Sequence, residues 1–430
     1  MSYEECEMIN MLLVKNGRLY DAMDNTADIL VVDGIITEVS EKIPESANMR
    51  IIDAGGQIVA PGLVDMHVHL REPGFEYKEE ILTGAAAAAA GGVTTCCCMP
   101  NTDPVADNAE VIQFIINKSK DAPASIIPIG AVTVGQEGVE LTNFAALKAA
   151  GAIALSDDGK AVQNARIMYI AMQLARDLNM LIISHCEDAD MAQNFAVNEG
   201  KASWELMLPG RPAAAEEIMV ARDVILASAT GARLHIAHVS TARSVEIIRK
   251  AKESGANITA ETCPQYFTLT EDEVLQKEAL ARMNQPLRTR EDVEAIIGGL
   301  VDGVIDAIAT DHAPHTSEEK ALPLAVAPSG IIGLETSLAL ALTYLYHTEK
   351  LSMERIVELM SIRPAGILGI PQPALTPGAA ADIVIFDPDE EWTVKPEEFR
   401  SKARNTPFAG MKLKGRVKHT ILRGKQVFPA

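Results

Sequence analysis

The sequence predicts an α/β fold, a (β/α)8 TIM-type barrel with a small composite β-sandwich domain built from both termini. Within residues 61–370, eight short apolar runs alternate with helical patterns, as parallel strands and their crossover helices would. No repeat of fixed period is visible, so a closed barrel is favoured over a solenoid. An open doubly wound sheet is the alternative, although no Gly-x-Gly-x-x-Gly fingerprint supports a dinucleotide site.

The two ends of the chain, residues 1–60 and 371–430, share a pattern of short β-branched runs. Residues 11–17 and 29–39 contain Asn-Gly and Asp-Gly pairs, which are strong hairpin signals. Residues 415–428 again form short alternating runs closed by glycine turns. We therefore expect the two ends to pair into one β domain, which would bring the termini together and leave residues 61–370 as the catalytic barrel.

The barrel strands are predicted where short apolar runs are bounded by polar or glycine positions. They are residues 63–68, 92–97, 125–131, 152–155, 180–184, 233–237, 257–260 and 304–309. A helix is predicted over residues 79–92, which begin with glutamates, continue in alanines and end in two glycines. A second helix is predicted over residues 107–120.

Polar side chains follow the predicted strands, at the end where a barrel of this type carries its active site. They are His67 and His69 after the first strand, Asp157 and Asp158 after the fourth, His185 after the fifth, His238 after the sixth and Asp311 after the eighth. Imidazole and carboxylate groups suit zinc, and three or more histidines with two carboxylates are enough for a two-metal site. The sequence therefore predicts a metal centre at the carboxyl ends of the strands.

The alternating direction of side chains along a strand separates expected ligands from their neighbours. His67 and His69 are two apart and point to the same face, so both imidazoles can reach one metal ion. His235 and His238 are three apart, so only His238 is expected to enter the barrel mouth, and His235 is assigned to packing or to support behind the site. By the same rule the carboxylate of Asp311 is expected to point inward.

Composition limits the possible classes of function. The formal net charge is −21, so no basic surface is available for nucleic acid. No apolar run approaches the roughly 18 residues that a membrane span needs. Residues 1–7 are acidic where an export signal would be basic, so a cytoplasmic location is expected. The six cysteines are expected to be thiols, and the consecutive Cys96, Cys97 and Cys98 to pack within a strand.

Six segments together carry a resemblance to a known family. They are residues 65–74 (Asp-Met-His-Val-His-Leu-Arg-Glu-Pro-Gly), 99–102 (Met-Pro-Asn-Thr), 156–159 (Ser-Asp-Asp-Gly), 184–187 (Ser-His-Cys-Glu), 235–238 (His-Ile-Ala-His) and 309–315 (Ala-Thr-Asp-His-Ala-Pro-His). With these segments in family order over nearly the whole chain, the sequence resembles the bacterial dihydroorotases of the amidohydrolase superfamily. The resemblance implies a reversible zinc-dependent cyclisation of N-carbamoyl-L-aspartate to L-dihydroorotate plus water, in pyrimidine (UMP) biosynthesis.

The resemblance also implies a set of metal ligands. Two zinc ions per subunit would be held by His67, His69 and Asp311 for one ion, by His185 and His238 for the other, and by Asp158 between them together with a water or hydroxide. Two alternatives to Asp158 as the bridge stay open, namely Asp157 and a modified Lys160.

For the small dianionic substrate, the resemblance implies that Arg71 and Asn101 clamp a carboxylate and that Asn284 and His315 contact the substrate. A planar guanidinium pairs with a carboxylate in a fork, so a strongly acidic protein can still hold a dianion. Asp311 is expected to be the general base, which takes a proton from the attacking water and delivers it to the departing ring nitrogen.

The resemblance does not specify the shape of the substrate pocket at two positions, and it is silent on one neighbouring loop. Gln265 and Gln285 depart from the family pattern, in which histidine and proline are common at these positions. Residues 312–322 mix small, charged and proline residues, and they are expected to form a mobile loop that closes over the site.

An allantoinase or dihydropyrimidinase is the alternative enzyme, and it should lack the clamp that Arg71 provides. A homodimer is expected, and association with aspartate carbamoyltransferase is a further expectation. A purely structural partner of that transferase would have lost metal ligands, and all six are present here.

Overall fold

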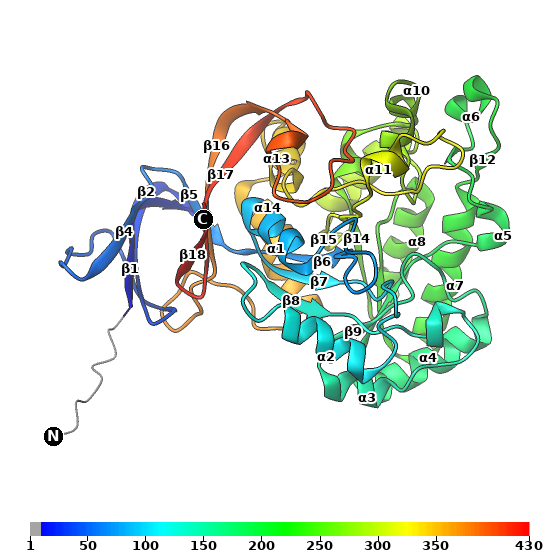
Figure 1. Ribbon diagram of the computed structural model, residues 1–430, viewed down its shortest axis with the longest axis horizontal. Helices are drawn as coiled ribbons and strands as arrows, with labels where there is room; N and C mark the ends of the chain where they lie inside the picture. Colours follow the sequence, from blue (N-terminus) through cyan, green and yellow to red (C-terminus); the bar gives the residue numbers. More distant parts are fainter. Residues whose placement is uncertain (1–9, 430) are drawn as a thin grey trace.

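The computed structural model describes residues 10–429 (Figure 1). Residues 1–9, and with them the acidic start of the chain and Cys6, lie outside this range, as does the expectation about export that rests on them. Within residues 10–429, no helix combines the length and the apolar character needed to cross a membrane. A sheet at one end of the molecule and a set of parallel strands surrounded by helices make up the fold (Figure 1).

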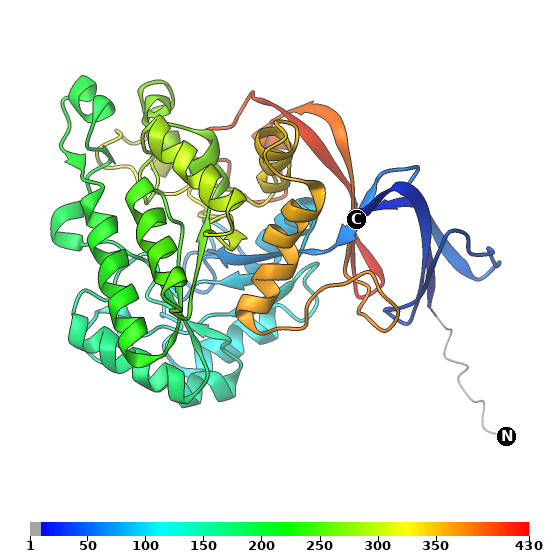
Figure 2. The same cartoon turned by 180° about the vertical axis from the view of Figure 1, so that it is seen from behind.

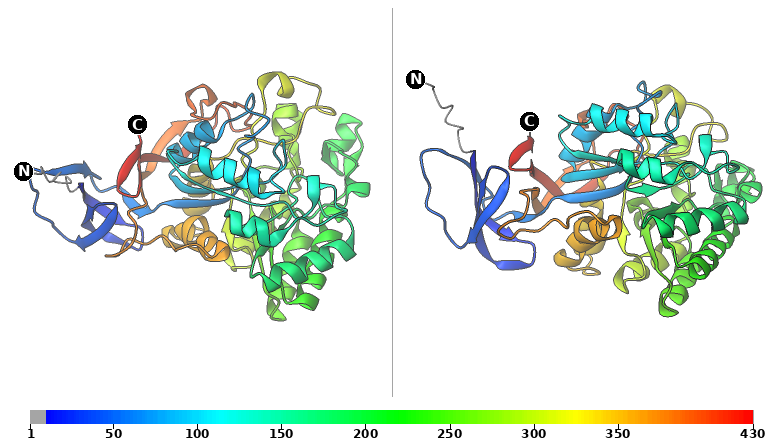
Figure 3. Two further views of the ribbon diagram at one scale, coloured as in Figure 1. Left: turned by 60° about the horizontal axis from the view of Figure 1, so that its bottom comes forward. Right: turned by 90° about the horizontal axis from the view of Figure 1, so that it is seen from below.

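One eight-stranded sheet combines both ends of the chain. Its strands are β1 (Met11–Leu19), β2 (Ala22–Val32), β3 (Ile35–Ser40), β4 (Met49–Asp53), β5 (Ile58–Pro61), β16 (Ile383–Thr393), β17 (Lys412–Leu422) and β18 (Lys425–Phe428). The order is β18–β17–β16–β5–β1–β2–β3, with β4 paired to β1. The two ends meet where β16 runs antiparallel to β5, with Ile383 opposite Pro61. Blue β5 and orange β16 therefore lie side by side in one sheet (Figure 3), as the sequence predicted.

A glycine turn closes the hairpin between β2 and β3, as the Asp-Gly pair predicted. The φ angles of Asp33 and Gly34 are 49° and 82°. Both are positive, as a two-residue type I′ turn requires. A Cβ on Gly34 would also lie 2.7 Å from the carbonyl oxygen of Arg423, so the contact between the two ends of the chain requires glycine here.

Two of the parallel sheets in the body of the molecule carry the predicted strands. One holds β6 (Leu63–Val68), β7 (Val93–Cys98) and β8 (Ser125–Pro128), and the other holds β9 (Ala154–Leu155), β10 (Leu181–Ser184), β13 (Arg233–Ile236), β14 (Ile258–Thr262) and β15 (Ala307–Ile308). Single parallel bridges link the two sheets on both sides, from Gly130 to Leu155 and from Val68 to His312. All eight predicted strands are thus present, neighbouring one another in chain order, and the α/β class is confirmed.

Several strands are shorter than the apolar runs that predicted them. The run 125–131 ends as a strand at Pro128, because proline has no N–H to continue the ladder, and only the bridge at Gly130 follows. Of the run 304–309, only Ala307–Ile308 pairs as a strand. The chain soon leaves the extended conformation there, since Asp311 has a φ of 49°.

Helices occupy the connections and cover the outer side of the strands (Figure 2). The longer ones are α1 (Ile81–Ala90), α2 (Ala109–Lys118), α3 (Phe144–Ala150), α4 (Ala165–Asp177), α7 (Ala214–Thr230), α8 (Ala242–Glu253) and α11 (Arg290–Val301). Short ones are α5 (Ala189–Ala192), α6 (Lys201–Leu206), α9 (Pro264–Thr268), α10 (Val274–Lys277), α12 (Ser317–Lys320), α13 (Ser337–Ala341), α14 (Met353–Val357) and α15 (Arg363–Leu368). The helices predicted over 79–92 and 107–120 are confirmed as α1 and α2, each two residues shorter at both ends.

The strands rest on packed apolar side chains. One buried cluster contains Val64, Cys97 and Ile183 from the strands and Leu368 from α15. These strand residues precede the strand ends, so they support the polar groups that follow. Cys96, Cys97 and Cys98 are all buried free thiols, as expected.

Candidate active site

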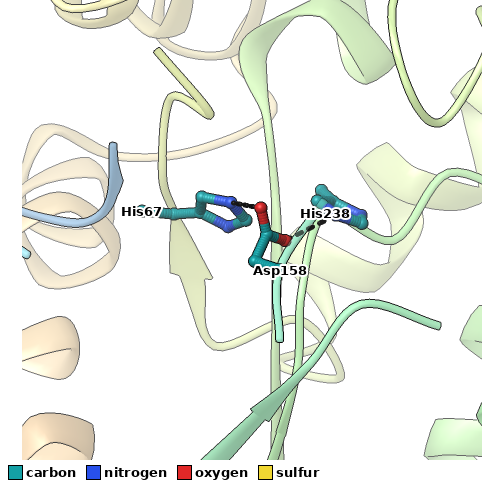
Figure 4. A group of neighbouring side chains, drawn as sticks. All are labelled: His67, Asp158 and His238. Atoms are coloured by element: carbon teal, nitrogen blue, oxygen red, sulfur yellow. Dashed lines mark ion pairs between the residues drawn. The ribbon is translucent and has the colours of Figure 1, made fainter. Parts of the chain in front are cut away.

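Asp158 lies at the centre of a buried cluster of polar side chains. Its carboxylate oxygen Oδ2 lies 3.3 Å from Nε2 of both His67 and His69, at the end of β6. The other oxygen, Oδ1, lies 3.3 Å from Nδ1 of His185, after β10, and 3.5 Å from Nε2 of His238, after β13. Figure 4 shows the Asp158 carboxylate between His67 and His238. One carboxylate therefore connects two pairs of imidazoles from distant parts of the sequence.

Asp311 adds a second carboxylate beside the pair formed by His67 and His69. Its Oδ1 lies 3.0 Å from His69 Nε2 and 3.6 Å from His67 Nε2. The ligand atoms of His67, His69 and Asp311 lie within 4.8 Å of one another, and so do those of His67, Asp158 and His238. His67 Nε2 and Asp158 Oδ1 are buried and have no hydrogen-bond partner in the described part of the chain. Orphaned ligand-type atoms at such distances fit a metal site.

The charges in the cluster favour a cation. Burial by itself would raise the pKa of the Asp158 carboxyl, but the neighbouring imidazoles, His67 foremost, hold it well below its usual range. Asp158 and Glu261 raise the pKa of His67 well above its ordinary value although burial opposes this. Against the same effect of burial, Asp158 and Glu187 raise the pKa of His185 to about 10. Protonated imidazoles supply the positive charge that the carboxylates favour. A divalent cation would supply the same charge while the imidazoles stay neutral.

The two competitors of Asp158 point elsewhere. The Asp157 carboxylate accepts hydrogen bonds from the backbone N–H groups of Val132 at 2.8 Å and Thr133 at 3.1 Å, and from the Thr133 hydroxyl. Lys160 is exposed to solvent. Of the three residues considered as a bridge, only Asp158 faces the histidines.

Left-handed backbone conformations at two strand ends change the predicted directions of side chains. The φ angle is 37° at His238 and 49° at Asp311, and such residues break the alternation of a strand. As expected, His238 reaches Asp158 and His235 does not enter the cluster itself. His235 Nε2 lies 3.3 Å from Glu261 Oε2, while Glu261 Oε1 lies 2.6 Å from His67 Nδ1. His235 thus supports the cluster from behind.

Two glutamates that support the ligands were missed by the sequence reasoning. Glu261 is fully buried at the end of β14, and His67 and His235 lower its pKa to about 2 against the effect of burial. Glu187 Oε2 lies 3.7 Å from Nε2 of His185. Carboxylates behind metal-binding histidines orient the rings and strengthen them as ligands. Glu261 directly follows the predicted strand 257–260, so the rule that found the other site residues would have found it too.

A cavity of about 170 Å³ opens over the cluster. It is lined by every predicted site residue apart from the fully buried His67, namely His69, Arg71, Asn101, Asp158, His185, His238, Asn284, Asp311 and His315. Arg71 Nε donates a hydrogen bond to the carbonyl of Pro314 at 3.2 Å. Asn101 Oδ1 lies 2.8 Å from His69 Nδ1. The predicted substrate residues and the predicted metal ligands therefore share one cavity.

The substrate side of this cavity carries positive charge. Burial lowers the pKa of Arg71, but only to about 10, so the guanidinium is charged at neutral pH. Burial and the adjacent Arg71 lower the pKa of His315 to about 2, so its imidazole is neutral. The Nε2–H of His315 then donates to the carbonyl of Ser329 at 2.8 Å. The cavity thus has a place for an anion although the chain as a whole is acidic.

The two departures from the family pattern lie behind the cavity wall. Gln265 and Gln285 are both buried, and neither lines the cavity. Gln285 Nε2 donates to the carbonyl of Cys186 at 3.3 Å. Within residues 10–429, Gln265 Nε2 and Gln285 Oε1 have no hydrogen-bond partner.

The predicted loop 312–322 contains α12 and is anchored at Lys320. Lys320 Nζ donates hydrogen bonds to the carbonyls of Ala279 at 2.9 Å, Arg282 at 3.1 Å and Pro328 at 2.8 Å. These bonds hold the loop against the rest of the chain in this conformation. Its movement over a substrate stays a prediction.

Solved structures of hydantoinases share the fold of this chain. L-hydantoinase (dihydropyrimidinase) from Arthrobacter aurescens matches with a TM-score of 0.86 at 28% identity, over 97% of this chain and 96% of that one. Dihydropyrimidinase from Brevibacillus agri matches with a TM-score of 0.83 at 23% identity, over 97% and 94% of the two chains.

Similarity in sequence is higher to a different group of proteins. Residues 56–244 match the family model described as Dihydro-orotase-like. The chain is 50% identical over 420 residues to the proteins named dihydroorotase from Acetivibrio thermocellus and from Ruminiclostridium cellulolyticum. Each of these alignments covers 97% of this chain and 98% of the relative. The chain therefore belongs to the dihydroorotase family of cyclic amide hydrolases.

Proposed function

We propose that the chain interconverts N-carbamoyl-L-aspartate and L-dihydroorotate plus water, as a zinc-dependent dihydroorotase of pyrimidine biosynthesis. The observation that carries this proposal is the shared cavity, in which metal-type ligands surround Asp158 and Arg71 supplies a positive charge beside them. Opening a ring amide requires an activated water and a polarised carbonyl, closing it requires a polarised carboxyl group, and the substrate carboxylate requires a cation. The full-length similarity to dihydroorotases supports the same reaction.

We assign two zinc ions to the cluster. His67, His69 and Asp311 would hold one ion, His185 and His238 the other, and Asp158 would bridge them together with a water or hydroxide. When bound, the two ions would lower the pKa of that water and polarise the ring amide carbonyl as Lewis acids. The two oxygens of Asp158 already face the two groups of ligands separately, which supports the bridging role.

Asp311 is assigned as the general base. Its carboxylate lies at the boundary between the metal-type cluster and the cavity, within 3.0 Å of His69 Nε2. From there it can accept a proton from the attacking water and pass it to the ring nitrogen as the amide bond breaks. In the cyclising direction the same carboxylate takes the proton from the ureido nitrogen as that nitrogen attacks the side-chain carboxyl group. The C–OH bond of that group then breaks, and the proton passes to the departing oxygen, which leaves as water. One group therefore serves both directions.

Arg71 and Asn101 are assigned to the substrate carboxylate, and Asn284 and His315 to further contacts with the substrate. Asn101 Oδ1 faces His69 Nδ1, so the Asn101 Nδ2 group is left to donate to an anion. The same contact places the proton of His69 on Nδ1 and leaves Nε2 free for a metal. Asn101 would thus serve the substrate and the metal centre together.

The proposed reaction fits the finer architecture that we infer from the strand order. We propose that the eight parallel strands close into a (β/α)8 barrel of residues 61–370, since the bridges at Gly130 and Val68 continue the pairing between the two sheets. Residues 1–60 and 371–430 would form the β-sandwich domain. A homodimer and an association with aspartate carbamoyltransferase stay predictions.

A hydantoinase-like activity on neutral rings is the second candidate, because solved structures of hydantoinases share the fold. Such rings carry no carboxylate, so they would offer the half-buried guanidinium of Arg71 no anionic partner. Arg71 therefore favours the dihydroorotase reaction.

The reaction is tested by the turnover of L-dihydroorotate by purified, zinc-loaded protein, with allantoin and dihydrouracil assayed in parallel. We expect turnover of dihydroorotate alone, and we expect chelation of the metal to abolish it. Turnover of the neutral rings would place the chain with the hydantoinase-like enzymes. A zinc-loaded protein without activity on dihydroorotate would refute the proposal.

The bridging role predicts different results for two adjacent carboxylates. Asp158→Asn should reduce bound zinc from two ions per subunit to one or none, measured by elemental analysis after dialysis. Asp157→Asn should keep both ions but lose about 1–3 kcal/mol of stability, because an amide N–H replaces the oxygen that accepts the hydrogen bond of the Thr133 hydroxyl. Full zinc content in the Asp158 variant, or loss of zinc in Lys160→Ala, would contradict the assignment.

The role of Asp311 as base predicts that Asp311→Asn lowers kcat by about 10²–10⁴-fold, the usual contribution of a positioned general base. Zinc should remain bound, because His67, His69 and Asp158 are unchanged. Turnover of that variant near the level of the unsubstituted protein, with the zinc content verified, would show that the proton is carried by another group.

A further inference from the structure

Arg211 is a buried arginine to which the proposed reaction gives no role. It ends β12 (Gly210–Arg211), which pairs with β11 (Val197–Asn198) in the segment between β10 and α7, and it is 1% exposed. Its Nη1 donates to Glu187 Oε1 at 2.6 Å and to Asn284 Oδ1 at 2.7 Å. Its Nη2 donates to the carbonyl of Phe195 at 2.9 Å. A guanidinium with three fixed partners has little freedom to move.

The contact with Arg211 determines which way the amide of Asn284 points. A guanidinium has donors only, so the atom of Asn284 that faces it must be the carbonyl oxygen. A flipped amide would bring two donors together and lose the hydrogen bond. Asn284 lines the cavity, and within residues 10–429 its Nδ2 has no recorded hydrogen-bond partner. The two N–H groups of Nδ2 are therefore left for an acceptor in the cavity.

Glu187 makes it possible to bury this arginine. One of its oxygens pairs with Arg211, and the other lies 3.7 Å from Nε2 of His185. The Oε1 atom of Glu187 lies 2.6 Å from Arg211 Nη1, so Glu187 is the counter-ion of this guanidinium. The same carboxylate thus contacts a predicted metal ligand on one side and the group that orients Asn284 on the other.

We infer that Arg211 is a positioning residue for substrate, which holds the Asn284 amide as a donor toward a carbonyl or carboxylate oxygen of the bound ligand. The inference rests on the proposed function and deepens it, because it specifies an oxygen acceptor, and not an N–H donor, for the part of the substrate at Asn284. Arg211 itself does not line the cavity, so it acts through Asn284.

The test begins with Arg211→Lys, which keeps the positive charge beside Glu187 but removes the fork that serves three partners. We expect KM for L-dihydroorotate to rise about tenfold, as the loss of one hydrogen bond to a charged group would cause, with kcat changed less than about threefold. The matched control is Arg222→Lys. Arg222 also pairs with a carboxylate, Asp223 Oδ1 at 2.8 Å, and donates to the carbonyl of Val162 at 2.8 Å, but it does not line the cavity. That variant should leave KM within about twofold.

The decisive comparison combines Arg211→Lys with Asn284→Ala. Because Arg211 acts through Asn284, the lysine substitution should add less than about twofold to the KM of the Asn284→Ala protein. A full tenfold rise in that background, or an equal rise in Arg222→Lys, would overturn the inference while dihydroorotase activity stands. An unchanged KM in Asn284→Ala would remove the proposed contact of Asn284 and the inference with it. Absence of turnover by the unsubstituted protein would instead refute the proposed function.

Discussion

The structure of the site depends on one buried negative charge, the carboxylate of Asp158. A buried carboxylate is costly unless positive groups surround it. Here imidazoles from the ends of β6, β10 and β13 provide that environment, so these strand ends must converge on the end of β9. The pattern continues outward, since His67 lies between Asp158 and Glu261, and His185 between Asp158 and Glu187. Carboxylates and imidazoles that alternate in this way form a cluster of the ligand types that divalent cations prefer.

The supports of the metal-type cluster are also the supports of the substrate side. Asn101 contacts His69 and lines the cavity, so one amide serves both. Glu187 contacts His185 and pairs with Arg211, which in turn contacts Asn284. Binding of metal and binding of substrate are therefore expected to depend on a common hydrogen-bond network. This arrangement also explains how a chain with a net charge of −21 maintains a cationic pocket for an anion.

Local rules predicted much of the fold and of the site, because apolar runs, helix ends and polar residues after strands are local features. The eight strands, α1, α2 and the cluster around Asp158 were found in this way. The alternation of side chains along a strand does not apply where the backbone leaves the extended form, as at His238 with a φ of 37°, although His238 lies in the predicted cluster. The local rules also missed contacts between distant residues, such as Glu261 with His67, 194 positions apart. Arg211 lies in a two-residue strand without a periodic pattern, so no sequence signal indicated its role.

The central claim is that Asp158 lies between two metal ions, and anomalous X-ray diffraction at the zinc absorption edge tests it most directly. Crystals of the zinc-loaded protein should show two anomalous peaks in each subunit. One peak should lie among His67, His69 and Asp311, and the other between His185 and His238, with the Asp158 carboxylate between the two peaks. A single peak, or a pair of peaks that Asp158 does not contact, would contradict the account.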